Sequence, residues 1–150
     1  MDRRISLIGF LALVVGGGLA IGALTAPDRW YAQLAKPSFN PPGWLFAPVW
    51  TLLYVLIAAA GWRIWRGDGR GWAMKLWWTQ LILNFAWSPV FFAAHRIGLA
   101  LLIVLLLLGV ILAFIAVASR QDRIAAWLFA PYAAWVAFAS LLNASIYLLN

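Results

Sequence analysis

The sequence predicts an all-α integral membrane protein, built as a bundle of five transmembrane helices. Of its 150 residues, 66% are hydrophobic and 10% are charged, which is more apolar surface than a soluble domain of this size buries. Apolar runs of about 20 residues, the length that spans a bilayer, occur five times. They occupy residues 5–24, 44–64, 72–92, 97–118 and 124–149. Because these runs use most of the chain, we expect a single transmembrane domain over residues 1–150.

The first run, residues 5–24, also has the basic start of a secretory signal, since Arg3 and Arg4 precede it. Its apolar stretch is longer than the roughly 7–15 residues of a signal core, and Pro27 would follow a cut after Ala26. We therefore expect a retained helix, with a cleaved signal as the alternative.

The distribution of basic residues predicts the orientation in the membrane. Eight of the eleven would lie at one end of the bundle, and three, Arg29, Lys36 and Arg96, at the other. An excess of Lys and Arg marks the cytoplasmic side. We expect a cytoplasmic N-terminus and an outward-facing C-terminus. The net charge of +7 then reflects membrane topology and predicts no nucleic-acid partner.

Most catalytic chemistries lack their residues in this chain. It has no cysteine and no glutamate, and its four aspartates lie outside the apolar runs. The only histidine, His95, lies at the end of a run, as an interfacial polar residue would. Neither a metal centre nor a carboxylate pair is predicted, and no cofactor is required.

Aromatic and neutral polar residues follow helical spacing in three of the runs, which places each set on one face. The sets are Phe46, Trp50 and Tyr54; Gln80, Asn84, Trp87 and Phe91; and Tyr132, Trp135, Ala139 and Asn143. They are the pattern of a pocket for a large, flat, apolar ligand, with a few neutral hydrogen-bonding groups. Contacts between packed helices are the alternative explanation.

Residues 27–43 form a long connection between the first two runs. Prolines at 37, 41 and 42 stiffen it, and Trp30, Tyr31 and Phe39 give it aromatic surface. Long connections are often functional lids, so we expect this segment to cover one end of the bundle. An interfacial connector is the alternative.

Four stretches, PDRWY, KPSFNPPGWLFAPVWTLLY, LNFAWSPVFF and PYAAWVAFASLLN, resemble motifs of the TspO/MBR family in the same order. The resemblance covers nearly the whole chain. It implies a five-helix bundle that forms a homodimer and binds porphyrins and haem-type tetrapyrroles, and in many members cholesterol and benzodiazepine-type drugs. The cholesterol-associated pattern of animal members is not met here, because no basic residue follows Tyr147. The missing basic tail fits a bacterial member, which would lie in the inner membrane.

The resemblance also implies roles for individual residues. Trp30 and Tyr31 match the lid and the pocket rim, Trp50 and Asn84 match positions that hydrogen-bond ligands, and Trp87, Trp135 and Ala139 match the pocket lining. The expected ligand-binding residues are thus Trp30, Tyr31, Phe46, Trp50, Tyr54, Asn84, Trp87, Tyr132, Trp135 and Ala139.

The function expected from the resemblance is that of a tetrapyrrole receptor, sensor or carrier. One alternative is a light- and oxygen-dependent porphyrin-degrading enzyme with Trp50 and Trp135 as the participating residues, and another is a passive tetrapyrrole transporter.

Gly18 and Gly22 form a small-xxx-small pair, which predicts either a dimer contact or close packing within the protomer.

Overall fold

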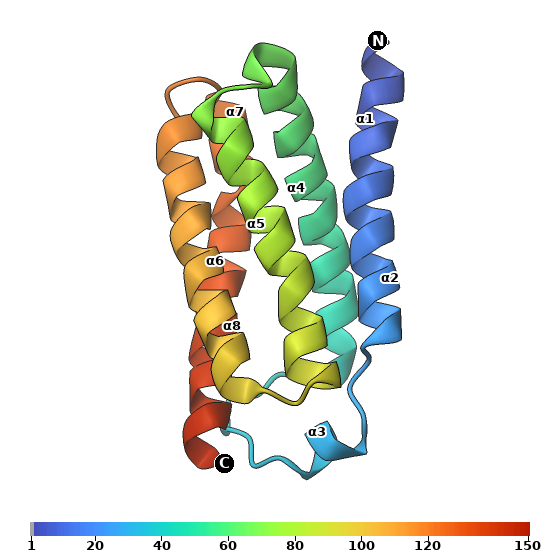
Figure 1. Cartoon of the computed structure of the whole chain (residues 1–150), viewed down its shortest axis with the longest axis vertical. Helices are drawn as coiled ribbons and strands as arrows, with labels where there is room; N and C mark the ends of the chain where they lie inside the picture. Colours follow the sequence, from blue (N-terminus) through green and yellow to red (C-terminus); the bar gives the residue numbers. More distant parts are fainter. Residues whose placement is uncertain (1) are drawn as a thin grey trace.

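The computed structural model describes residues 2–150, and these form a bundle of long, roughly parallel helices (Figure 1). The predicted fold class is confirmed. Four helical segments are long and apolar enough to cross a membrane, namely Arg3–Leu24, Gly43–Asp68, Ile97–Ala118 and Arg123–Leu149. A further apolar helix, α5, runs beside them and completes the bundle of five.

The helices follow the predicted runs closely. The first span joins α1 (Arg3–Leu11), a π-helical turn (Ala12–Gly16) and α2 (Gly17–Leu24), and the short helix α3 (Arg29–Gln33) lies in the connection that follows. A 3-10 turn (Gly43–Leu45) leads into α4 (Phe46–Asp68). The remaining elements are α5 (Trp72–Ser88), a π-helical turn (Pro89–Ala93), α6 (Ile97–Ala118), α7 (Arg123–Leu128) and α8 (Ala130–Leu149).

Two prolines account for irregularities inside the predicted runs. Pro89 has no amide hydrogen to give, and the chain continues past it as a π-helical turn in which Ala94 N–H bonds the Pro89 carbonyl at 2.9 Å. The last run is divided at Phe129, between α7 and α8. Pro131 lies just after this break and cannot donate to the carbonyl of Trp127, four residues earlier.

Helix packing leaves one end of the bundle tighter than the other. α5 packs along α6, α6 packs along α8, and α4 contacts α7 much more than α8. A methyl group at Gly61 of α4 would overlap the Trp77 ring of α5, and Trp77 donates its indole N–H to the Ile57 carbonyl at 2.9 Å. Because lipid gives helices no hydrophobic drive to associate, such close contacts and hydrogen bonds stabilise the bundle.

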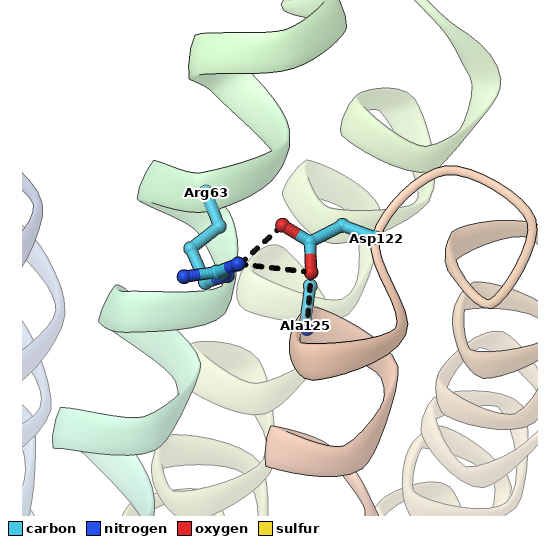
Figure 2. A network of polar contacts seen from close by, with 3 residues as sticks. All are labelled: Arg63, Asp122 and Ala125. Atoms are coloured by element: carbon cyan, nitrogen blue, oxygen red, sulfur yellow. Dashed lines mark hydrogen bonds and ion pairs between the residues drawn. The ribbon is translucent and has the colours of Figure 1, made fainter.

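An ion pair ties α4 to α7 at the end that holds the chain's N-terminus. Figure 2 shows the Arg63 guanidinium on both oxygens of Asp122, with the Nε contact at 2.9 Å. Asp122 also accepts from the Ala125 amide at 3.1 Å and so caps the start of α7. The segment Pro27–Gly43, hereafter the lid, lies at the opposite end with the C-terminus (Figure 1).

Candidate ligand-binding site

A cavity of about 590 Å³ lies between the first span, α4, α5, α6 and α8, and the lid contributes to one side of it. Its volume falls in the range of about 300–1,000 Å³ that is typical of small-molecule sites. Among the described residues, no Asp, Glu, Lys, Arg or His side chain lines it. The lining therefore suits the apolar body of a ligand that makes a few directed hydrogen bonds.

The three predicted aromatic stripes converge on this cavity. Eight of the ten expected ligand-binding residues line it: Tyr31, Phe46, Trp50, Tyr54, Asn84, Trp87, Trp135 and Ala139. Their rings also contact one another, as in the edge-to-face pair of Phe46 and Trp135 with centroids 5.9 Å apart. They line one cavity because each stripe occupies one face of its helix and these faces turn toward the same space.

Tyr132 does not line the cavity but lies fully buried behind it, at 0% exposure. Its hydroxyl donates to Gln80 Oε1 at 2.8 Å and accepts from Asn84 Nδ2 at 2.7 Å. Asn84 Oδ1 accepts no hydrogen bond among the described residues and is not closed off from the cavity, so it is available to a ligand donor. Tyr132 therefore orients a cavity residue rather than contacting the cavity itself.

Trp87 and Asn143 form a second polar pair across the cavity, between α5 and α8. The Trp87 indole donates to Asn143 Oδ1 at 3.0 Å, and Asn143 Nδ2 donates to the Ile97 carbonyl at 3.2 Å. Both side chains line the cavity, so their polar edges hold the helices together while the indole surface remains for a ligand.

Two buried polar atoms at the cavity have no hydrogen-bond partner among the described residues. They are the indole nitrogen of Trp135, a donor, and Oδ1 of Asn40 in the lid, an acceptor. Buried polar groups are normally paired, and an unpaired one costs roughly 1–3 kcal/mol. Because neighbouring atoms close both of them off from the cavity, a ligand would pair with them only after the covering side chains shift.

The lid is folded onto the connection between α5 and α6. Asp28 caps α3 by accepting from the Tyr31 amide at 3.2 Å, and its second oxygen lies 3.2 Å from His95 Nε2. The His95 ring stacks on Trp30, with centroids 4.1 Å apart. Trp30 is thus a lid contact that does not line the cavity, and His95 holds the lid in place.

Burial and hydrogen bonds fix the inner surface of the lid. Burial raises the pKa of the Tyr31 hydroxyl, so this side chain faces the cavity as a neutral phenol. The Lys36 ammonium closes the end of α3 by donating to the Tyr31 carbonyl at 2.7 Å and the Leu34 carbonyl at 3.1 Å. The Asn150 side chain bonds both backbone groups of Ala35, which ties the lid to the end of α8.

The first span forms a wall of the cavity, which the sequence did not indicate. Gly18, Gly22 and Thr25 line it. Gly18 is buried, and a methyl group there would overlap the Tyr54 ring of α4, whereas a methyl at Gly22 would meet nothing within 4 Å. At Gly18 the structure therefore shows close packing within the protomer, the alternative to a dimer contact.

Some residues that line the cavity were not among the expected ligand-binding residues. Asn143 and Phe91 stood on predicted stripes but were not named as ligand-binding residues, and the others lie outside the stripes. The further contributors come from the lid, α5, its π-helical extension and α6, and they include Asn40, Phe85, Ser88, Phe92, Val104 and Leu107.

The comparisons with known proteins agree with this architecture. The model of the TspO/MBR family matches residues 10–149. The chain is 38% identical to the tryptophan-rich sensory protein of Cereibacter sphaeroides, covering 94% of this chain and 89% of the relative. It is 39% identical to the tryptophan-rich protein TspO of Archaeoglobus fulgidus, with 97% of each covered, and 40% identical to the translocator protein of Bos taurus, with 91% and 85% covered. This chain therefore belongs to the TspO/MBR family of integral membrane proteins.

Proposed function

We propose that the protein is a membrane receptor, sensor or carrier that binds tetrapyrroles of the porphyrin and haem type in the cavity beneath the lid. The observation that carries this proposal is the neutral cavity of about 590 Å³ lined by aromatic residues of α4, α5, α8 and the lid. A relative named a tryptophan-rich sensory protein supports a sensing role.

A tetrapyrrole matches the chemistry of the cavity. It is a large, flat aromatic body, and aromatic pairs add roughly 0.5–1.5 kcal/mol each beyond the area that they bury. Asn84 Oδ1 offers it a neutral hydrogen bond, and Asn40 Oδ1 and the Trp135 indole N–H would add two more once the side chains that cover them shift. Benzodiazepine-type drugs, which share aromatic rings and neutral acceptors, fit the same description; the structure supplies no separate argument for sterols.

Titration of the purified full chain with protoporphyrin IX, followed by quenching of tryptophan fluorescence, tests the proposal. The Asn84→Ala/Trp135→Ala double variant should bind at least about tenfold more weakly, since it loses a hydrogen-bonding group and an aromatic face. Trp72→Ala is the matched control, because Trp72 is 70% exposed and does not line the cavity. Unchanged affinity in the folded double variant would show that the stripes serve packing alone.

A light-driven degradation of the bound porphyrin is the second candidate. The observation that favours it is that two indoles, those of Trp50 and Trp135, line the cavity. An excited porphyrin transfers its energy to O₂, and the resulting reactive oxygen adds to the macrocycle while the protein holds the ring. Trp50→Phe/Trp135→Phe keeps most of the apolar surface. Breakdown at the wild-type rate in that variant would rule out a part for the indoles, and equal breakdown in the dark would rule out the light-driven mechanism.

For the orientation we propose a cytoplasmic N-terminus and an outward-facing lid and C-terminus in a bacterial inner membrane. Eight basic residues lie at the end of the bundle with the N-terminus and three at the lid end, which is the asymmetry of the positive-inside rule. A reporter fused after Asn150 that is active only in the cytoplasm should stay silent. A strong signal from it would reverse the assignment.

A further inference from the structure

A second hollow lies far from the lid, at the outer surface where α6 meets α7. It has a volume of about 430 Å³ and is lined by Ile115, Ser119, Arg123, Ala126, Trp127 and Ala130. We propose that this groove binds one anionic phospholipid, with the phosphate on Arg123 and an acyl chain along the apolar part. The proposal concerns a site separate from the cavity beneath the lid.

The groove changes along its length from charged to apolar, in the same order as the parts of a phospholipid. Arg123 and Trp127 lie at i and i+4 on one side of α7, about 6 Å apart along its axis at roughly 1.5 Å per residue. Ala130, the first residue of α8, continues the groove past the break at Phe129. A cation at the helix end, followed by an indole and then by alanine, follows the order of phosphate, glycerol region and acyl chain.

Arg123 is available to a ligand because the nearby carboxylate is engaged elsewhere. Asp122 holds Arg63 with both oxygens and caps α7 through Ala125, so its charge is directed toward α4 (Figure 2). Among the described residues, no acidic group lies within ion-pair distance of Arg123. A phosphate would therefore supply the negative charge that the protein does not.

The membrane setting favours a lipid over other occupants. Trp127 is 75% exposed, and an indole at the end of a span lies at the level of the headgroups. Basic pockets between transmembrane helices are sites for anionic headgroups. A helix of a second copy seated here would have to bury the Arg123 guanidinium, which is costly without a carboxylate to pair it.

Native mass spectrometry of the detergent-solubilised full chain tests the proposal, with phosphatidylglycerol and phosphatidylcholine of identical acyl chains and with glycerol 1-phosphate. Phosphatidylglycerol should saturate one site and bind more tightly than either of the others. Arg123→Gln should weaken it about fivefold, the usual effect of one basic residue at an anionic lipid surface. Arg120→Gln is the charge-matched control, because Arg120 lies outside the groove and should matter much less. Trp127→Ala, a change at an exposed side chain, should also weaken phosphatidylglycerol.

Several results would overturn the assignment. Equal binding of the two lipids would remove the role of charge, and equal losses in Arg123→Gln and Arg120→Gln would reduce it to a general surface attraction. Glycerol 1-phosphate binding as well as phosphatidylglycerol would indicate a site for soluble anions. If the variants altered the oligomeric mass and left lipid binding unchanged, the groove would be a protein interface. Unchanged helical circular dichroism and unfolding temperature in the same samples show that the fold is intact.

Discussion

The carboxylate of Asp28 contacts His95 Nε2 at 3.2 Å, and through this contact the lid is fastened to the connection between α5 and α6. The same carboxylate caps α3, and the histidine ring stacks on Trp30 in the lid. His95 adopts a left-handed backbone conformation, with φ at 57°, which a non-glycine residue rarely does. One exposed pair thus combines a helix cap, an ion pair and an aromatic stack.

Asp28→Asn should accelerate release of bound porphyrin. Asparagine caps a helix about as well as aspartate, so the substitution removes the charge and keeps α3. Stopped-flow fluorescence gives the release rate, and Asp28→Ala, which also removes the cap, should accelerate release further. If Asp28→Asn released the ligand at the wild-type rate at every pH, the ion pair would play no part in lid closure.

The effect of Asp28→Asn should also depend on pH. The Tyr31 amide, and to a smaller extent His95, hold the pKa of Asp28 below its ordinary 3.8. A lowered folded pKa means that the contribution is complete above pH 3.8 and is lost as the pH falls through the folded value. The difference in release rate between wild type and Asp28→Asn should therefore shrink as the pH falls below 3.8.

The Arg63–Asp122 pair predicts a modest, salt-dependent contribution to stability. Burial raises the pKa of Asp122, but the Ala125 amide and Arg63 together lower this pKa by more than burial raises it. The pKa of Asp122 therefore lies below its ordinary value of 3.8. Its stabilisation is therefore present above that pH and is lost as the pH falls through the folded pKa. Because the pair is partly exposed, Asp122→Asn should cost about 0.2–1 kcal/mol, and Asp122→Ala about 1 kcal/mol more through the lost cap.

Thermal unfolding in detergent at low and high salt checks this prediction. The deficit of Asp122→Asn should diminish in high salt, since salt screens an exposed pair, while the additional deficit of Asp122→Ala should persist. A deficit of several kcal/mol that salt does not change would contradict the view that the pair is a surface interaction.

The sequence predicted the spans well because run length and helical period are local properties. Residues 97–118 were predicted as a helix and form α6 with the same bounds, and the stripe of Phe46, Trp50 and Tyr54 lines the cavity as a face of α4. Helical period predicts which face a residue occupies but not how deeply it lies. Tyr132 was accordingly placed on the correct stripe, yet it lies behind the cavity and bonds Asn84.

Contacts between segments that are far apart in the sequence cannot be predicted from run length or helical period. The Trp30–His95 stack joins residues of the lid to the far end of α5, and no local pattern marks it. The signal at Gly18 was present, since small residues allow close approach, but the sequence does not say which helix approaches. The structure shows that this helix is α4, through Tyr54.

Gly18→Ala should destabilise the protein and distort the cavity, because the new methyl group would overlap the Tyr54 ring. Overpacking of this kind typically costs about 1–3 kcal/mol. Gly22→Ala is the matched control, since a methyl there meets nothing within 4 Å. Unfolding temperature, porphyrin affinity and detergent-corrected mass distinguish the cases: loss of a homodimer with an intact binding site would assign Gly18 to an interface instead.

Tyr132→Phe should lower stability by about 1–3 kcal/mol, since it leaves Asn84 Nδ2 and Gln80 Oε1 without their shared hydroxyl. It should also weaken porphyrin binding, because the Asn84 amide is then free to rotate, although Tyr132 does not line the cavity. Denaturation of the empty protein and a separate porphyrin titration measure the two effects. Tyr147→Phe is the control, because Tyr147 is 52% exposed, does not line the cavity and makes no hydrogen bond through its hydroxyl within the described residues. A loss of stability with fully retained affinity would show that Tyr132 does not orient the site.

Trp135→Phe should reduce ligand binding but, unlike Tyr132→Phe, should leave the stability of the empty protein unchanged. The Trp135 indole N–H is buried without a partner among the described residues, so its removal breaks no hydrogen bond in the empty protein. The phenyl ring keeps the edge-to-face contact with Phe46, and the loss of an unpaired polar group offsets part of the lost ring area.

Porphyrins with acceptor substituents should bind several-fold more weakly to the variant, because the hydrogen bond that this nitrogen gains in the complex is worth about 0.5–1.5 kcal/mol. An etioporphyrin, which carries alkyl groups in place of the acceptors, should bind nearly as well to the variant as to the wild type. Equal losses for both porphyrins would mean that only the area of the indole matters.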